Sequence, residues 1–376
     1  MNNLIKIDIN PNRIFGLDIL RAVAILFVVA GHGGNLVEYE TYKYINYFIF
    51  DGVSIFFVLS GFLIGGILIK ILNNHVIDLK LIVSFWIRRW FRTLPNYFLI
   101  LIIIILLNII FNQNFVLIDK LNYFIFSQNL FTGHPDFFPE AWSLTIEEWF
   151  YLLIPIILYI LIKGLKLSID KAIIMTVIGI IISVTFFRYY RFTFLTVFDF
   201  KTWVSLFPGQ VSTRLDSLMY GILGAYIYSN YLGFWKKYKV HFFILGLFLF
   251  LTDKFNFFNF NEFELYDSVF SFSIISMATL FLLPFLSLLK TGNGFFYKYL
   301  TYISLISYSM YLVNYTLVLQ WIIIKIDWTA LQEFNSYLSL MTKYFLFWFL
   351  TIALSIIIYK HFEIPIMNLR DRIKLK

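Results

Sequence analysis

The sequence predicts an all-α integral membrane protein with about ten transmembrane helices. Hydrophobic residues make up 60% of the 376 residues, whereas an ordinary soluble protein has roughly 45–50%. Charged residues make up 14%, against roughly 25%, and ten stretches approach the length of about 20 apolar residues that a bilayer requires. These observations exclude a soluble globular enzyme, a disordered chain and a nucleic-acid-binding protein. Cysteine is absent, which excludes disulfides, thiolate metal sites and an acyl-cysteine intermediate.

The ten predicted spans follow one another along the whole chain. They cover residues 15–37, 48–72, 93–111, 142–163, 171–188, 211–229, 239–253, 268–290, 299–325 and 341–361. The stretch 239–253 is short, and 211–229 carries Arg214 and Asp216, so these two are the least typical. The first twelve residues are polar, and no small-residue cleavage site follows the first apolar run. We therefore expect the first helix to remain as a membrane anchor.

The distribution of basic residues predicts that both termini are cytoplasmic. With the N-terminus inside, 20 of the 30 Lys and Arg residues fall in cytoplasmic segments, 8 fall on the outer side, and Arg21 and Arg214 fall inside spans. Cytoplasmic loops of membrane proteins carry such an excess. The longest connections, about 112–141 and 189–210, are shorter than a usual soluble domain. We therefore expect one transmembrane domain over residues 1–376 with no appended soluble domain, and any chemistry among the helices or at their mouths.

The first predicted helix carries three ionisable residues, which are costly in a bilayer and so indicate function. Asp18 and Arg21 are three residues apart and can pair on one face. Arg21 and His32 are eleven residues apart, close to three full turns, so both project from the same face about 16 Å apart. This helix thus presents a cation and a titratable base to one cavity. The alternative is that Arg21 snorkels to the interface while His32 lies in the polar run 31–34.

A cluster of arginine and aromatic residues precedes the third predicted span on the cytoplasmic side. Within residues 85–95, Arg88, Arg89 and Arg92 alternate with Phe and Trp. One interpretation is an interfacial helix on anionic lipid. The other is a set of guanidinium groups for a phosphate-bearing ligand that arrives from the cytoplasm.

Two carboxylates lie near the start of the fourth predicted span, where they are costly. Glu147 and Glu148 are adjacent and point about 100° apart, so at most one can face a cavity squarely. We expect the other to reach the outer interface. The alternative places both carboxylates among the lipid headgroups.

Other polar and small residues occur within the predicted spans. Polar positions that could line an interior site are Arg214, Asp216, Ser307, Tyr308, Ser309, Tyr311 and Asn314. Small residues in the second span allow close helix packing, and these are Gly52, Ser60, Gly61, Gly65 and Gly66. We expect Glu363, followed by Ile364 and Pro365, to mark a helix end fixed by proline.

Taken together, the motifs resemble the membrane acyltransferase-3 family, which consists of ten-helix, acyl-CoA-dependent O-acyltransferases. The resemblance covers about residues 13–370 and keeps the order of the family's pieces. These pieces are Gly16 to Ala22 with His32 completing Arg-x10-His, Gly52 to Phe62, Arg88-Arg89-x-x-Arg92-x-x-Pro95, Trp142-Ser143-Leu144-x-x-Glu147 with Phe150, Tyr151 and Pro155, and Arg214 with Gly221. Each motif alone is weak evidence for the family, whereas five motifs in the family's order are specific to it.

The resemblance implies transfer of an acyl group, often acetyl, from cytoplasmic acyl-CoA to a hydroxyl of a cell-surface or exported glycan or lipid-linked sugar. It implies His32 as the general base, a pKa near 6.5 being suited to proton removal at neutral pH, with Arg21 and Glu147 as the other catalytic residues. Acyl-CoA would bind to Arg88, Arg89, Arg92 and Arg21 as a co-substrate. The acceptor would contact Asp18, Ser60, Trp142, Tyr151, Arg214 and Tyr311. No metal or permanently bound cofactor is expected, and the location would be a bacterial cytoplasmic membrane.

Several alternatives remain open at the level of sequence. A transporter or flippase could use Arg21, His32 and Glu147 as a substrate or proton path, although paired broken helices in two matching halves are not found. A non-catalytic relative could bind a glycan or lipid. Direct transfer is the preferred mechanism, and an acyl-serine through Ser60 or Ser143 is the other route. Many relatives have His where this chain has Asn314, which cannot shuttle a proton near neutral pH.

Overall fold

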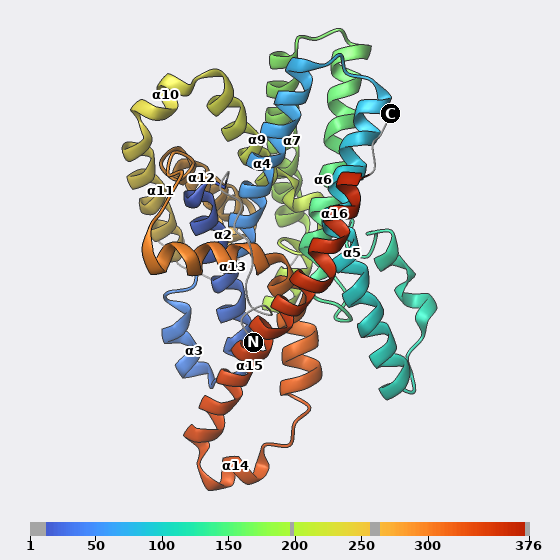
Figure 1. Cartoon of the computed structure of the whole chain (residues 1–376), viewed down its shortest axis with the longest axis vertical. Helices are drawn as coiled ribbons and strands as arrows, with labels where there is room; N and C mark the ends of the chain where they lie inside the picture. The colour runs from blue at the N-terminus through green and yellow to red at the C-terminus, as the bar shows by residue number, and fades with distance from the viewer. Residues whose placement is uncertain (1–12, 196–198, 256–263, 373–376) are drawn as a thin grey trace.

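The computed structural model describes residues 13–195, 199–255 and 264–372, and every regular element in these ranges is helical (Figure 1). The long helices are α2 (Phe15–Gly33), α4 (Gly52–Asn74), α5 (Leu79–Phe111), α6 (Ala141–Tyr159), α7 (Ile169–Phe194), α9 (Val211–Asn230), α11 (Lys239–Lys254), α12 (Ser271–Leu286), α13 (Gly294–Val313) and α15 (Ser336–Ile358). Shorter helices are α3 (Tyr39–Asn46), α8 (Phe200–Leu206), α10 (Leu232–Lys237), α14 (Thr329–Phe334) and α16 (Ile364–Arg372). Two 3-10 segments, η1 (Gly34–Leu36) and η2 (Leu117–Phe124), and four π-helical segments, η3 (Ile160–Gly164), η4 (Tyr266–Phe270), η5 (Asn314–Ile323) and η6 (Tyr359–Glu363), complete the described elements.

The all-α membrane fold is confirmed, since each of the ten predicted spans falls on a helix. Eight helices among the described residues are long and apolar enough to cross a membrane. The two predicted spans outside that set are α9, which contains Arg214 and Asp216, and α11, which has only 16 residues. The chain is thus a multi-pass membrane protein in which α9 and α11 depart from the usual composition or length of a span.

The third predicted span begins earlier than expected. Helix α5 starts at Leu79 rather than at residue 93 and runs for 33 residues, a length of about 50 Å at 1.5 Å per residue. The Asp78 side chain accepts a hydrogen bond from the backbone N–H of Leu81 and caps the first turn. Because a bilayer core is only about 30 Å thick, the arginine cluster belongs to an extension of this span rather than to a separate interfacial helix.

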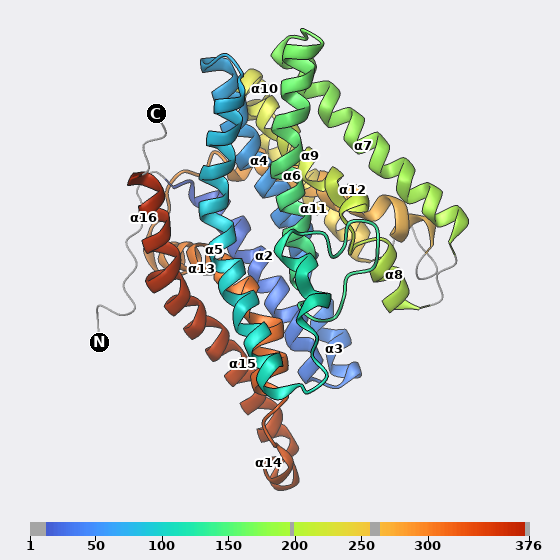
Figure 2. The same cartoon turned by 90° about the vertical axis from the view of Figure 1, so that its right-hand side faces the viewer.

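Several connections lie towards opposite ends of the molecule. Helix α10 and the loops joining α4 to α5 and α6 to α7 lie at the upper end of Figures 1 and 2. Helices α3 and α14 lie at the lower end. The count of basic residues predicts that the first group is cytoplasmic and that the second group lies outside.

Close backbone contact between α4 and α9 holds the centre of the bundle together. A Cβ atom built on Gly61 would lie 2.0 Å from the carbonyl oxygen of Leu218, and one built on Gly221 would lie 2.1 Å from that of Val58. No side chain fits in such a space, so the glycines on both helices are required. Small residues at helix contacts are the usual solution in membranes, where the hydrophobic effect does not drive helices together. Gly66, in contrast, faces open space.

Gly61→Ala is therefore expected to lower the thermal unfolding midpoint of the purified protein in detergent. The added methyl group forces α4 and α9 apart, and such overpacking typically costs about 1–3 kcal/mol. Gly66→Ala is the matched control, since its methyl group meets no atom within 4 Å and alanine favours a helix over glycine by about 1 kcal/mol. Equal midpoints for the Gly61 variant and the wild type would contradict this packing.

Candidate active site

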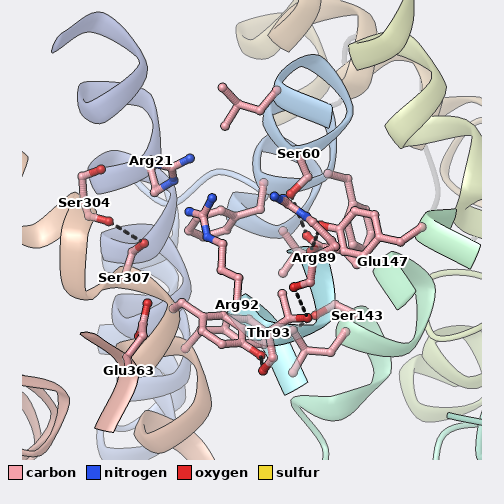
Figure 3. Close-up of a pocket in the computed structure, with 18 of the residues that line it drawn as sticks. Arg21, Ser60, Arg89, Arg92, Thr93, Ser143, Glu147, Ser304, Ser307 and Glu363 are labelled. Atoms are coloured by element: carbon pink, nitrogen blue, oxygen red, sulfur yellow. Dashed lines mark hydrogen bonds between the residues drawn. The ribbon is translucent and has the colours of Figure 1, made fainter. Parts of the chain in front are cut away.

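A polar chamber lies among α2, α4, α5, α6, α13 and η6 (Figure 3). Its cavity volume is about 100 Å³, which is enough for several water molecules. The lining contains residues of the two hydrophobic clusters that form the core, for example Tyr151 from one and Leu144 from the other. The polar lining residues are Arg21, Ser60, Arg89, Arg92, Thr93, Ser143, Glu147, Tyr151, Ser304, Ser307, Tyr308, Tyr311 and Glu363.

Three guanidinium groups face this chamber (Figure 3). Arg89 and Arg92 are three residues apart on α5 and so share a face, and Arg21 approaches from α2. The Cζ atom of Arg89 lies 4.8 Å from the centroid of the Tyr151 ring. The buried Nε of Arg89 has no hydrogen-bond partner. Among the described residues, no hydrogen bond is found for the guanidinium of Arg21 or Arg92. Repulsion between like charges is strong away from bulk water, so an anion in the chamber would stabilise this arrangement.

Asp18 pairs mainly with a residue that sequence reasoning missed. Arg13 Nε donates to Asp18 Oδ2 at 2.9 Å, and Ser304 Oγ donates to Asp18 Oδ1 at 2.7 Å. The predicted pairing with Arg21 is present but looser, with 3.8 Å between Arg21 Nη1 and Asp18 Oδ1. Asp18 therefore joins the start of α2 to α13 and leaves Arg21 largely free for the chamber. A basic residue just before an apolar run was the available signal for Arg13.

Glu147 faces the chamber and is held from two sides. Ser60 Oγ donates to Glu147 Oε1 at 3.0 Å, and Tyr151 Oη donates to Glu147 Oε2 at 2.7 Å. Tyr151 is one turn further along α6, and Ser60 comes from α4. The carboxylate is thus fixed in direction while it faces a space lined by arginine.

The prediction that the second carboxylate reaches the outer interface is wrong. Glu148 is buried between α5 and α6, where its Oε1 accepts a hydrogen bond of 2.7 Å from Thr93 Oγ1. The reason is that α5 runs alongside α6 and supplies a hydroxyl at that level. A buried polar side chain with a partner is more stable than one without, and sequence spacing alone gives no information on a partner from another helix.

Glu363 is a chamber residue, and the prediction of a helix end at Glu363 to Pro365 is wrong, because α16 (Ile364–Arg372) continues directly from η6. Glu363 is the last residue of η6, and its Oε2 accepts hydrogen bonds from Asn96 Nδ2 at 2.6 Å and Ser309 Oγ at 3.1 Å. Neither donor was assigned to a site from the sequence, although Ser309 was noted as a possible lining residue. The sequence signal that could have identified Glu363 as a site residue is a carboxylate at the end of a long apolar stretch.

His32 does not line the chamber, and it contacts a residue one turn after the lining residue Tyr311. The Tyr311 hydroxyl is 2.6 Å from Ser143 Oγ and donates to the Glu140 carbonyl oxygen at 3.0 Å. One turn further along the chain, Asn314 Oδ1 lies 2.5 Å from His32 Nδ1. The structure therefore brings Arg21, Arg89, Arg92 and Glu147 into one space and places His32 next to it.

Besides Asp18 and His32, three predicted site residues are absent from the chamber lining. Arg88 is exposed and is absent from the chamber lining. Trp142 packs edge-to-face against Phe57 with ring centroids 6.0 Å apart. Arg214 is 1% exposed and belongs to a separate polar cluster.

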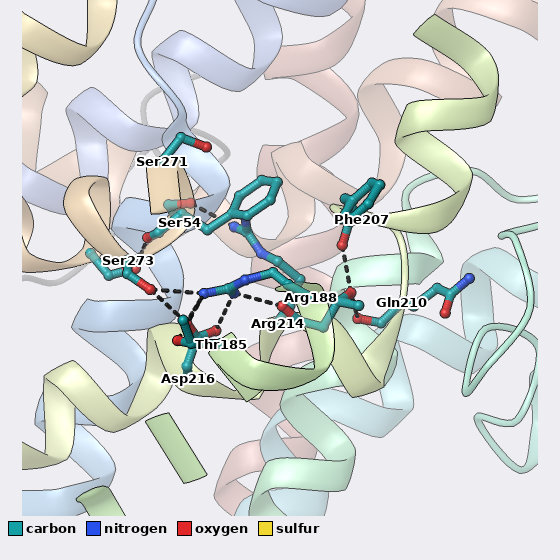
Figure 4. Close-up of polar contacts among 12 residues, drawn as sticks. Ser54, Thr185, Arg188, Phe207, Gln210, Arg214, Asp216, Ser271 and Ser273 are labelled. Atoms are coloured by element: carbon teal, nitrogen blue, oxygen red, sulfur yellow. Dashed lines mark hydrogen bonds and ion pairs between the residues drawn. The ribbon is translucent and has the colours of Figure 1, made fainter. Parts of the chain in front are cut away.

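This separate cluster joins α4, α7, α9 and α12 (Figure 4). Arg188 and Asp216 are both 0% exposed and form a two-pronged ion pair, with Nη1 to Oδ1 at 3.0 Å and Nη2 to Oδ2 at 2.7 Å. Ser273 adds a hydrogen bond to each of them. Arg214 donates to Ser54 Oγ at 2.6 Å and lies over the Phe272 ring at 4.3 Å. The contacts of this cluster are all internal, which indicates that it holds helices together.

The helical bundle and its chamber define a multi-pass membrane protein with an interior cavity lined by arginine. The acyltransferase 3 family, described as "Acyltransferase domain", matches residues 14–360. The chain therefore belongs to the acyltransferase 3 family.

Curated relatives include O-acetyltransferases of three bacteria. O-acetyltransferase OatA of Staphylococcus aureus is 27% identical over 343 residues, which cover 82% of this chain and 51% of the relative. Peptidoglycan O-acetyltransferase OatA of Listeria monocytogenes is 32% identical over 172 residues, covering 40% of this chain and 25% of the relative. The putative peptidoglycan O-acetyltransferase YrhL of Bacillus subtilis is 32% identical over 182 residues, covering 44% and 26%. The matches thus span from a quarter to about half of the length of these relatives. No solved structure matches the chain.

Arg188→Met is expected to destabilise the protein by about 3–5 kcal/mol, because it leaves Asp216 charged and buried without its partner. Thermal unfolding in detergent measures the effect. Lys171→Met, which removes an exposed cation from the same helix, is the control and should lie within about 0.5 kcal/mol of the wild type. The double variant Arg188→Met with Asp216→Leu should recover much of the loss, since no unpaired charge remains. An unchanged midpoint in Arg188→Met alone would contradict the structural assignment of this pair.

Proposed function

We propose that this protein is an O-acyltransferase that moves an acyl group, specifically acetyl, from cytoplasmic acyl-CoA to a hydroxyl of a cell-surface glycan. The observation that carries the proposal is the set of three guanidinium groups facing one chamber, with donors that have no protein partner. Membership of the acyltransferase 3 family and the O-acetyltransferase names of its relatives support it.

The chamber suits the phosphate groups of coenzyme A. Arginine binds phosphate through two parallel hydrogen bonds, and Arg21, Arg89 and Arg92 offer such pairs. Arg92 is exposed, so it would meet the ligand first, on the side that the basic residues assign to the cytoplasm. The thioester end would then extend towards Glu147, Ser60 and Tyr311.

His32 would act as the base in a direct transfer. The acceptor hydroxyl gives its proton to the imidazole while its oxygen forms a bond to the thioester carbonyl carbon. The carbon–sulfur bond then breaks, and the departing thiolate takes up the proton, so that the products are an ester and free CoA. Positioned hydroxyl donors stabilise the oxyanion of such an intermediate. Tyr311 and Ser143 line the chamber and contact each other, and in this mechanism they form the boundary between the chamber and His32. Tyr311 and Ser143 must part for the thioester to reach the base.

The acceptor would approach from the His32 side of this boundary. Two relatives are named for peptidoglycan, and we propose a glycan hydroxyl of this class for the present chain. The Tyr315 ring lies 4.7 Å from the His32 ring and offers an aromatic face beside the base. Trp142 and Tyr151, which sequence analysis assigned to the acceptor, instead contact Phe57 and Glu147 respectively.

The purified protein in lipid nanodiscs is expected to release free CoA from acetyl-CoA when a surface-glycan extract is added. His32→Ala should lower kcat by about 10²–10⁴-fold, the usual contribution of a general base, and should still bind CoA in isothermal titration. Arg92→Ala should weaken CoA binding about 10- to 150-fold, since hydrogen bonds to charged groups contribute about 1.5–3 kcal/mol.

Lys80→Ala, which removes an exposed cation from the first turn of the same helix as Arg92, serves as the control and should bind CoA as the wild type does. Absence of both CoA binding and glycan-dependent CoA release in the wild type would refute the acyltransferase proposal and favour a transporter.

A further inference from the structure

The side-chain amide of Asn314 has a fixed orientation. Its Nδ2 donates to the carbonyl oxygens of Met310 at 2.9 Å and Tyr311 at 2.8 Å. Carbonyl oxygens only accept hydrogen bonds, so the nitrogen of the amide must face them. A reversed amide would place its oxygen against these two oxygens and lose both bonds, at about 1–3 kcal/mol for each unsatisfied buried group. Asn314 Oδ1 is therefore the atom that faces His32.

This orientation decides which nitrogen of His32 carries a proton. Asn314 Oδ1 lies 2.5 Å from His32 Nδ1, and an amide oxygen cannot donate. Nδ1 must therefore be the donor, and a neutral imidazole protonated at Nδ1 has a free electron pair at Nε2. Among the described residues, none forms a hydrogen bond with Nε2, which leaves this nitrogen available to an incoming hydroxyl.

The helix at Asn314 changes to π-helical geometry and is hydrogen-bonded to the residue before a neighbouring helix. Asn314 is the first residue of the π-helical segment η5, directly after α13, and such segments occur frequently at functional sites. Two residues later, the backbone N–H of Thr316 donates to Glu140 Oε1 at 2.7 Å, and the Thr316 hydroxyl donates to the other carboxylate oxygen. Glu140 directly precedes α6, so the segment that carries Asn314 is fixed to the start of the helix that carries Glu147.

We infer that Asn314 is a positioning residue that holds His32 as the tautomer protonated at Nδ1, so that Nε2 accepts the proton of the acceptor hydroxyl. Its role in acyl transfer rests on the proposed function, whereas the tautomer follows from the hydrogen bonds alone. During transfer, Nε2 gains the hydroxyl proton, the imidazolium keeps its Nδ1–H bond to Asn314, and the proton then passes from Nε2 to the departing thiolate. Asparagine thus needs no proton of its own to serve at this position.

Nitrogen NMR of protein labelled with ¹⁵N-histidine tests the tautomer directly. The chain has five histidines, and the His32 signals are identified by their loss in His32→Gln. The wild type is expected to show a protonated Nδ1 and an unprotonated Nε2 at neutral pH. Asn314→Ala should lose this preference, whereas Asn314→Asp, which keeps an acceptor oxygen, should retain it. A wild-type His32 protonated at Nε2 would overturn the inference.

Kinetics separate positioning from a merely structural role. Asn314→Ala should lower kcat for acetyl transfer by at least about tenfold, since the wrong tautomer costs a serine protease about 10⁴ in kcat. Its KM for acetyl-CoA should stay within about twofold, because the donor chamber is intact. Asn314→Asp should recover part of kcat. An unchanged kcat in Asn314→Ala would remove the positioning role.

Asn108→Ala is the matched control, because Asn108 also donates from its side chain to a carbonyl four residues earlier, that of Ile104 at 2.9 Å, and lies outside the site. It should match the wild type in both the spectrum and kcat. If the wild type releases no CoA, the proposed function fails, and the spectrum still decides the tautomer. If Asn314→Ala does not fold, Asn314→Asp and the wild-type spectrum decide the inference.

Discussion

The cost of holding several positive charges inside a membrane bundle is the constraint on which the rest of this structure depends. Arg21, Arg89 and Arg92 face one space, and charges of the same sign repel strongly where water is scarce. Two carboxylates, Glu147 and Glu363, line the same space and compensate part of this charge. The remaining positive charge is the basis on which we propose a phosphate-bearing ligand for the chamber.

The same constraint accounts for the polar side chains that come from distant parts of the chain. Ser60 and Tyr151 each donate to Glu147, and Asn96 and Ser309 each donate to Glu363. A carboxylate with two donors keeps its direction, and preorganised groups in a site with little water need no rearrangement during reaction. The network therefore gives stability to the bundle and order to the site at the same time.

Intramembrane charge does not by itself identify a ligand site. Arg188, Arg214 and Asp216 are as deeply buried as any charged residues in the described structure, yet their contacts are with each other, with serines and with aromatic rings. Unpartnered donors do not make the difference, because Arg188 Nε and Arg214 Nε and Nη1 also have no hydrogen-bond partner. The arginines of the chamber differ because they line a cavity that Arg188 and Arg214 do not line. That access to a cavity separates the cluster that joins helices from the proposed donor site.

The sequence by itself determined the helices and many of the residues of the site. Apolar length predicts spans, and spacing along one helix predicts shared faces, because both are local properties; Arg89 and Arg92 on α5 are an example. Only the tertiary structure decided that Arg88 is excluded, that Glu148 turns to Thr93 and that Asn314 meets His32. Each of these depends on which helix lies alongside, and the partners are up to 282 residues apart in the chain. Hydrogen-bond direction at such distances follows from packing, which no local pattern contains.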